Sequence, residues 1–339
     1  MAQFMTVRGP VDAGSCGMVL SHEHMFIDLA NQAAPGCRKG PVTAADRPAL
    51  MRDPYCMEDD LRVDRYDWAL EELRTLAKLG CDTVADCTLR EIGRDPLRLK
   101  RLSEESGVNI VMGCGWYTGD THPAEVAALT EEELAERLLA EIREGVDGTG
   151  IRPGIIGEIG TSRELLPGER KALSAAALAQ RETDLAVQVH VYPWCANGLE
   201  ATDILFHYGV RPDRIVICHS DVTPDRAYIA ELLRRGVYVQ LDNFGKEFTP
   251  EPGGFAAGRF ITDRERAELA AWIIGSGYED QLLLTNDICL KCMLKSCGGK
   301  GYAHIFETVL PLLMELGVPE KLLMEKIMRA NPLAMLCGR

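Results

Sequence analysis

The sequence lacks the features that mark several large classes of protein. Its 339 residues contain no run of about 18 consecutive apolar residues, so we expect no membrane span. Basic residues are scarce relative to acidic ones: 37 lysines and arginines stand against 51 aspartates and glutamates, and the net charge is −14. Because nucleic-acid binding depends on cations that neutralise phosphates, this balance argues against a nucleic-acid partner. It is compatible with an enzyme that acts on a small molecule.

Two local signals are also missing. The first residues, MAQFMTVRGPVDAGS, include neither the basic segment nor the apolar core of a secretory signal, so we expect a cytoplasmic protein. The twelve cysteines are then expected to be reduced thiols. Cys289, Cys292 and Cys297 lie close together, but a structural zinc site needs four ligands and no clear fourth ligand is nearby. The sequence therefore assigns these three cysteines no role.

What the sequence does contain is an alternation of short apolar runs with longer amphipathic segments. Leucine and alanine recur in the longer segments at three- and four-residue spacing, which is typical of helices packed on one face. The runs that we interpret as buried strands are 17–20 (GMVL), 83–87 (TVADC), 109–113 (NIVMG), 154–160 (GIIGEIG), 186–191 (AVQVHV), 214–219 (RIVICH), 237–241 (VYVQL) and 281–285 (QLLLT). The predicted helices between them are 65–79, 95–106, 130–144, 169–181, 201–208, 225–235 and 263–276.

This alternation predicts an α/β protein with one parallel sheet. Nearly continuous apolar strands separated by helices are typical of a sheet that is covered on both faces. Eight such units in a single domain, 1–339, fit a (β/α)8 TIM barrel. The rival, a doubly wound open sheet, would carry a glycine-rich phosphate loop after an early strand, whereas GSCGMVLSHEH precedes its strand. Residues 302–316 and 320–328 are predicted to add two C-terminal helices.

Metal-binding side chains gather where the predicted strands end. The two histidines of SHEH are two residues apart, so on a strand both rings would point to the same face. In a barrel the carboxyl ends of all strands meet at one face, where catalytic groups converge. Taken singly, each of these residues also has a structural explanation, such as a buried hydrogen bond or a helix cap. Together they predict a metal site made of His22, His24, Glu158, His190, His219 and Asp287.

With these positions in place, the chain resembles the phosphotriesterase family of the amidohydrolase superfamily, and within it the phosphotriesterase-related branch. The resemblance rests on SHEH, GVNIVMGCGWYTGDTHP, GIIGEIGTS, AVQVHVYP, IVICHSD, NDI and GGKGYAHIFETVLPLL, and so extends along most of the chain. One position departs from the founding enzymes of the family. They carry a carboxylated lysine after the fourth strand, where this chain has Glu158.

The resemblance implies a binuclear centre. One divalent ion would be held by His22, His24 and Asp287, and a second by His190 and His219. Glu158 and a hydroxide would bridge the two ions. Asp287 would also be the catalytic residue that takes the proton of the attacking water. Nitrogen and carboxylate ligands favour Zn²⁺, with Mn²⁺, Fe²⁺ or Co²⁺ as alternatives.

The loops after the strands are expected to form the substrate pocket. Aromatic residues there combine an apolar body with a polar tip. Lysines bring positive charge to the pocket of an acidic protein, which favours an anionic substrate, although each could equally be a solvated loop residue. The predicted substrate contacts are Trp116, Tyr117, His122, Tyr192, Lys246 and Lys291.

These observations predict a metal-dependent hydrolase of a small carboxyl compound: a lactone, an ester or an N-acyl amide. A phosphoester or phosphotriester hydrolase is the alternative among enzymes. A catalytically silent, metal-containing binding protein is the alternative from another class. The resemblance also implies a homodimer.

Overall fold

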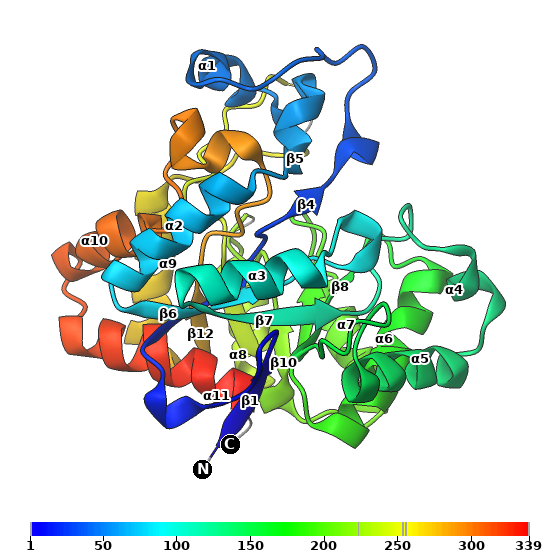
Figure 1. Cartoon of the computed structure of the whole chain (residues 1–339). Helices are drawn as coiled ribbons and strands as arrows, with labels where there is room; N and C mark the ends of the chain where they lie inside the picture. Colours follow the sequence, from blue (N-terminus) through cyan, green and yellow to red (C-terminus); the bar gives the residue numbers. More distant parts are fainter. Residues whose placement is uncertain (1, 223, 253, 255, 338–339) are drawn as a thin grey trace.

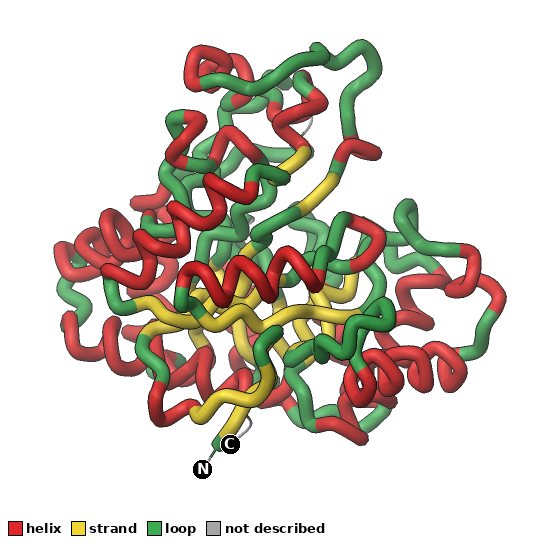
Figure 2. Tube along the Cα trace, viewed as in Figure 1, coloured by secondary structure: helices red, strands yellow, loops and turns green. Residues whose placement is uncertain are grey.

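The computed structural model describes residues 2–337 except 223, 253 and 255, and its centre is an eight-stranded parallel sheet (Figures 1 and 2). Its strands are hydrogen-bonded in chain order, and the last returns to the side of the first, so the sheet forms a nearly closed barrel. This confirms the predicted TIM barrel. The strands are β3 (Met18–Glu23), β6 (Cys81–Asp86), β7 (Asn109–Cys114), β8 (Ile155–Gly160), β9 (Val187–His190), β10 (Ile215–Ile217), β11 (Tyr238–Leu241) and β12 (Leu282–Leu284).

Helices surround the barrel, and all seven predicted between strands are present. They are α2 (Tyr66–Lys78), α3 (Pro96–Ser106), α5 (Glu131–Glu144), α6 (Pro167–Thr183), α7 (Gly198–His207), α8 (Arg226–Arg234) and α9 (Asp263–Gly275). Short helices α1 (Arg47–Leu50) and α4 (Ala124–Ala128) occur in loops. No helix in the described part of the chain is both long and apolar enough to cross a membrane. The expected homodimer and cytoplasmic location stay predictions.

Local sequence explains where these helices begin and end. Asp95 precedes α3 and its carboxylate accepts the Arg98 backbone N–H at 3.0 Å, while Pro96 begins the helix without needing a hydrogen-bond partner. Gly107 ends the helix with a φ of 80°, a left-handed conformation that glycine adopts at low cost. In α5, Thr130 and Glu133 form a reciprocal capping box.

Two small antiparallel pairs were not predicted. The hairpin of β1 (Gln3–Thr6) and β2 (Gly9–Asp12) precedes the barrel. The pair of β4 (Ile27–Asp28) and β5 (Arg62–Val63) encloses a long excursion between β3 and α2, which rises above the barrel at the top of Figure 1. This excursion covers part of the face that carries the strand ends.

The C-terminal helices differ from the prediction. The first consists of a π-helical segment (Ile305–Val309) that continues into α10 (Leu310–Glu315). The second was predicted to end at residue 328, but a π-helical segment (Leu322–Ala330) runs on into α11 (Asn331–Cys337). Pro332 lies where the π-helical segment passes into α11, and because proline has no backbone N–H it cannot donate a helical hydrogen bond at this junction.

A buried arginine holds this last helix to the barrel. Arg214, just before β10, has no exposed surface. Its guanidinium donates to the carbonyl oxygens of Ala334 at 2.7 Å and Met335 at 2.9 Å. Carbonyl groups at a helix C-terminus have no partner within the helix, so the arginine satisfies acceptors that would otherwise be buried and unpaired.

We therefore expect Arg214→Met to lower the free energy of unfolding by about 2–4 kcal/mol, because buried acceptors lose their donor. Urea denaturation followed by circular dichroism measures this. The control is Arg211→Met, which removes an exposed ion pair with Asp184 and should stay within about 1 kcal/mol of the native protein. Equal stabilities of the two variants would contradict the anchoring role.

Candidate metal centre

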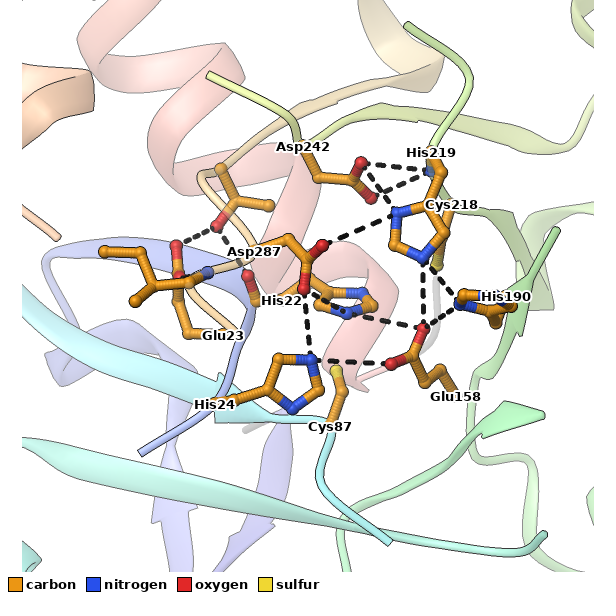
Figure 3. A network of polar contacts seen from close by, with 12 residues as sticks. His22, Glu23, His24, Cys87, Glu158, His190, Cys218, His219, Asp242 and Asp287 are labelled. Atoms are coloured by element: carbon orange, nitrogen blue, oxygen red, sulfur yellow. Dashed lines mark hydrogen bonds and ion pairs between the residues drawn. The ribbon is translucent and has the colours of Figure 1, made fainter. Parts of the chain in front are cut away.

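The six predicted ligand residues converge at the carboxyl ends of the barrel strands (Figure 3). His190 is 15% exposed and the other five are buried. They come from β3 and its end (His22, His24), β8 (Glu158), β9 (His190) and the loops after β10 (His219) and β12 (Asp287).

The Glu158 carboxylate is the centre of the cluster. Its Oε2 lies 3.1 Å from His190 Nδ1, 3.2 Å from His219 Nε2 and 3.5 Å from His22 Nε2. Its Oε1 lies 3.4 Å from His24 Nε2. One carboxylate therefore faces all four imidazoles, with its two oxygens turned to different histidines.

The backbone before this glutamate requires a glycine. Gly157 has a φ of 116°, and a Cβ atom there would lie 2.2 Å from the Gln188 carbonyl oxygen. No other residue type fits this close approach of β8 to β9. The glycines that flank the acid in GIIGEIG thus include one that lets the strand deliver Glu158 to the centre.

Asp287 completes the cluster, with one oxygen toward two histidines and the other toward a lysine. Oδ1 lies 3.0 Å from His24 Nε2 and 3.5 Å from His22 Nε2. Oδ2 accepts a hydrogen bond from the buried ammonium group of Lys246. Burial alone would raise the pKa of Asp287, but Lys246 and His24 lower it well below its usual range. The carboxylate is therefore ionised at neutral pH.

Outer hydrogen bonds set which nitrogen of each ring faces the centre. The Asp242 carboxylate can only accept, so His219 donates from Nδ1 to it at 3.0 Å. Gln188 donates through Nε2 to the Ser21 carbonyl at 2.9 Å, so its Oε1 offers an acceptor to His22 Nδ1 at 3.1 Å, while the donating Gln240 amide nitrogen lies 3.0 Å from the same atom. When His22 and His219 bind an ion through Nε2, Nδ1 of each ring carries the proton, and Gln188 and Asp242 are the acceptors within reach.

The other two histidines follow different patterns. His24 places Nδ1 2.9 Å from the Thr88 hydroxyl and Nε2 in the cluster. His190 is reversed, with Nδ1 toward Glu158, and the Tyr117 hydroxyl lies 3.3 Å from the same nitrogen.

These donors fit divalent cations. His22 Nε2 is buried and has no hydrogen-bond partner in the described part of the protein. Two groups of potential ligands, His22 with His24 and Glu158, and Glu158 with His190 and His219, share the same carboxylate. Imidazole and carboxylate donors suit zinc and neighbouring transition metals.

The pKa values of the histidines show how much negative charge surrounds them. Burial alone would lower the pKa of His24, but hydrogen bonds to Asp287 and Glu158 raise it to about 9. Burial likewise disfavours the charged form of His219, while Asp242 and Glu158 raise its pKa to about 10. The cluster therefore favours positive charge, which protons or metal ions can supply.

A third group of potential ligands, His22, Cys218 and Asp242, lies deeper in the barrel. The amide nitrogen of Gln240 already occupies its middle, 3.0 Å from His22 Nδ1, 3.5 Å from Cys218 Sγ and 3.0 Å from Asp242 Oδ2. This group is a packed polar layer below the centre and needs no ion.

A cavity of about 370 Å³ opens above the cluster. Of the predicted substrate contacts, Tyr117, Tyr192 and Lys246 line it. Cys289 lines it as well, whereas Cys292 and Cys297 are buried in the core.

Three predicted substrate contacts are corrected, because they do not line this cavity. Trp116 turns to the other side of the chain from Tyr117 and lines a separate pocket beside Glu141. His122 places Nε2 2.8 Å from the Tyr117 carbonyl oxygen and lies outside the cavity. Lys291 is buried and ion-paired with Asp59 and Asp64 of the excursion, at 2.7 and 3.1 Å.

Sequence reasoning missed the residues that orient the ligands. Gln188 and Asp242 are polar residues in or directly after otherwise apolar strands, and Gln188 precedes His190 by two residues, on the same strand face. That spacing was a usable signal. Thr88 and the cavity residue Arg163 lie in loops whose paths the sequence does not reveal.

Comparison with known proteins finds similarity along nearly the whole chain. The model of the phosphotriesterase family matches residues 2–336. The chain is 32% identical to an N-acetyltaurine hydrolase of Xenopus tropicalis, with 96% of this chain and 95% of the relative covered. It also resembles the crystal structure of a resiniferatoxin-binding protein from Rhodobacter sphaeroides, with 33% identity and a TM-score of 0.94. The match covers 99% of this chain and 95% of that protein. A phosphotriesterase homology protein from Escherichia coli, with phosphate in its active site, matches at 28% identity and TM-score 0.80 (96% and 100% covered).

The barrel and the residues at its strand ends thus define a metal-dependent hydrolase that acts on small molecules. The chain belongs to the phosphotriesterase family, which uses a binuclear divalent metal centre.

Metal binding at this site is expected to displace protons. Because His24 and His219 have pKa values of about 9 and 10 without metal, both are protonated at pH 7 and must lose a proton to bind an ion. We expect Zn²⁺ binding to the metal-free protein to release protons at pH 7, and the apparent affinity to rise with pH toward 9. Calorimetric titration in buffers of different ionisation enthalpy measures the release. A binding enthalpy independent of the buffer would contradict it.

Gln188 is expected to strengthen metal binding by orienting His22. Gln188→Met removes the acceptor of His22 Nδ1–H, so we expect metal affinity to fall by about 10- to 100-fold. Gln188→Glu keeps an acceptor at this position, so its metal affinity should fall less than that of Gln188→Met. Competition with a chromogenic chelator gives the dissociation constants, and equal affinities of the native protein and Gln188→Met would show that the tautomer is set elsewhere.

Proposed function

We propose that this protein hydrolyses the acyl bond of a small, anionic carboxyl compound, with an N-acyl amide preferred to a lactone or ester. The observation that carries the proposal is the shared Glu158 carboxylate, which faces four histidines at the floor of a cavity. The cavity volume of about 370 Å³ suits a small ligand. Similarity to an N-acetyltaurine hydrolase supports the choice of an amide that bears an acidic group.

Two divalent ions, most simply Zn²⁺, fit the donors. His22, His24 and Asp287 would hold one ion, His190 and His219 the other, and Glu158 would contact both. Ions held there would supply Lewis-acid chemistry, which makes water a nucleophile at neutral pH and polarises a carbonyl group.

The chain's own residues would handle the protons. Asp287 is ionised and its Oδ1 faces the histidine cluster, so it can accept the proton of the attacking water and pass it to the leaving amine. Lys246 holds Oδ2, which fixes the carboxylate in this orientation. Burial raises the pKa of Tyr117, so its hydroxyl stays protonated and can donate to a substrate oxygen.

The test is a substrate panel with the metal-loaded protein. We expect hydrolysis of N-acyl amides that carry a sulfonate or carboxylate, weaker hydrolysis of lactones and esters, and little of phosphotriesters. Asp287→Asn should lower kcat on the best substrate by about 10²- to 10⁴-fold, the usual contribution of a general acid or base. Metal content and the circular dichroism spectrum of the variant show whether ions and fold are retained.

The outcomes separate the candidate functions. Preferred cleavage of phosphoesters would favour the phosphoester hydrolase, the reading supported by the relative with phosphate in its active site. No turnover of any compound at full metal loading would favour a binding protein, as the name of the relative from Rhodobacter sphaeroides suggests for that protein. Asp287→Asn activity within tenfold of the native protein would refute the proton-transfer role.

A further inference from the structure

Two cationic side chains other than histidine line the described part of the cavity, and they differ in what already neutralises them. Lys246 is buried and its ammonium group is hydrogen-bonded to Asp287. Its positive charge is therefore matched by a carboxylate inside the site. The second cation is Arg163, in the loop that follows β8.

Arg163 keeps its guanidinium available. Within the described residues, its side chain has no ion pair and no hydrogen bond, and the residue is exposed at the rim of the cavity. Its Cζ atom lies 6.0 Å from the centroid of the Tyr192 ring, which also lines the cavity. An arginine in this position keeps all its N–H groups for a ligand and can bind an oxyanion through two parallel hydrogen bonds.

The backbone that carries this free side chain is held firmly. The buried Glu169 accepts the Ser162 N–H at 3.0 Å, the Ser162 hydroxyl at 2.6 Å and the Leu166 N–H at 2.9 Å. Asn197 donates to the Ser162 carbonyl at 2.7 Å. The backbone at Arg163 is thus fixed before any ligand binds, so the entropy lost on binding is that of the side chain and not of the loop.

Aromatic side chains line the cavity beside Arg163. The rings of Tyr192 and Trp194 are 5.8 Å apart in an edge-to-face arrangement, and both line the cavity. Such a wall can hold a short aliphatic segment between a polar head group at the rim and the bond at the metal centre.

We infer that Arg163 binds the anionic head group of the substrate, a sulfonate or a carboxylate at the end of a short aliphatic chain. Arg163 thereby selects N-acyl amides whose amine part carries an anionic group over neutral N-acyl amides. Lys246, by contrast, holds the Asp287 carboxylate in place. The expected effect of Arg163 on the rate rests on the proposed amide hydrolysis. The expected binding of the anion by Arg163 does not.

The kinetic test compares three amides of similar length: N-acetyltaurine, N-acetyl-β-alanine and the neutral N-acetylethanolamine. We expect Arg163→Met to lower kcat/KM for the two anionic amides by about 10- to 100-fold, as expected for the loss of a charged hydrogen-bonded pair. The neutral amide should be hydrolysed by Arg163→Met as by the native protein. Arg163→Lys keeps the positive charge but loses the paired N–H donors of the guanidinium. Its kcat/KM for the anionic amides should lie between those of the native protein and Arg163→Met.

The matched control is Arg181→Met, which makes the same charge change at an exposed position near the end of α6. It should leave all three kcat/KM values unchanged. Equal losses of Arg163→Met on anionic and neutral amides, or no loss on the anionic ones, would overturn the inference.

A binding measurement keeps the inference testable if no amide is cleaved. Propane-1-sulfonate binding to the metal-loaded protein, followed by calorimetry, should be weaker by about tenfold or more in Arg163→Met and unchanged in Arg181→Met. Equal dissociation constants in the native protein and Arg163→Met would refute the role of Arg163, whatever reaction the enzyme catalyses. Absence of amide turnover together with a clear Arg163 effect on binding would instead refute the proposed reaction alone.

Discussion

A buried carboxylate at the centre of a barrel is the constraint on which this structure depends. Glu158 is 2% exposed and faces four imidazoles, and a negative charge in such a place is costly unless cations surround it. The barrel brings them from the ends of three different strands, β3, β9 and β10, because only its closed parallel sheet collects strand ends around one point. The barrel topology and the chemistry of the site therefore have one physical cause.

The rings around Glu158 are held by groups that never face the cavity. Gln188 and Asp242 offer acceptors to the outer nitrogens of His22 and His219, and each ring turns its other nitrogen inward. Glu23 points away from the cluster and accepts the Asn286 and Ile288 N–H groups, both at 2.9 Å, which ties β3 to the loop that carries Asp287. Hydrogen bonds outside the cluster thus hold its histidines and the Asp287 loop in position.

The sequence allowed prediction of the fold and of the side chains that converge at the strand ends, because both leave regular traces. Buried parallel strands appear as apolar runs, and ligand residues such as His190 follow those runs at their ends. Loop side chains leave no such trace. Trp116 and Tyr117 are adjacent but line different pockets, and nothing in the sequence shows which of them faces the cavity. Lys291 is held away from the cavity by acids of the excursion that are distant in sequence. The late end of the last helix likewise depends on packing against Arg214.

One short segment, which begins at β8, carries residues of both the metal centre and the proposed head-group site. Glu158 and Arg163 are five residues apart on it, and Glu169 and Asn197 prevent the loop from shifting. In the proposed complex, the metal centre and the backbone at residue 163 therefore stand at a constant separation, and only the Arg163 side chain can adjust to the ligand. An amide whose acyl carbon and anionic group are farther apart or closer together than this side chain can span would occupy one end of the site but not both. Discrimination by chain length would then depend on where the main chain places residue 163, and discrimination by charge on its guanidinium group.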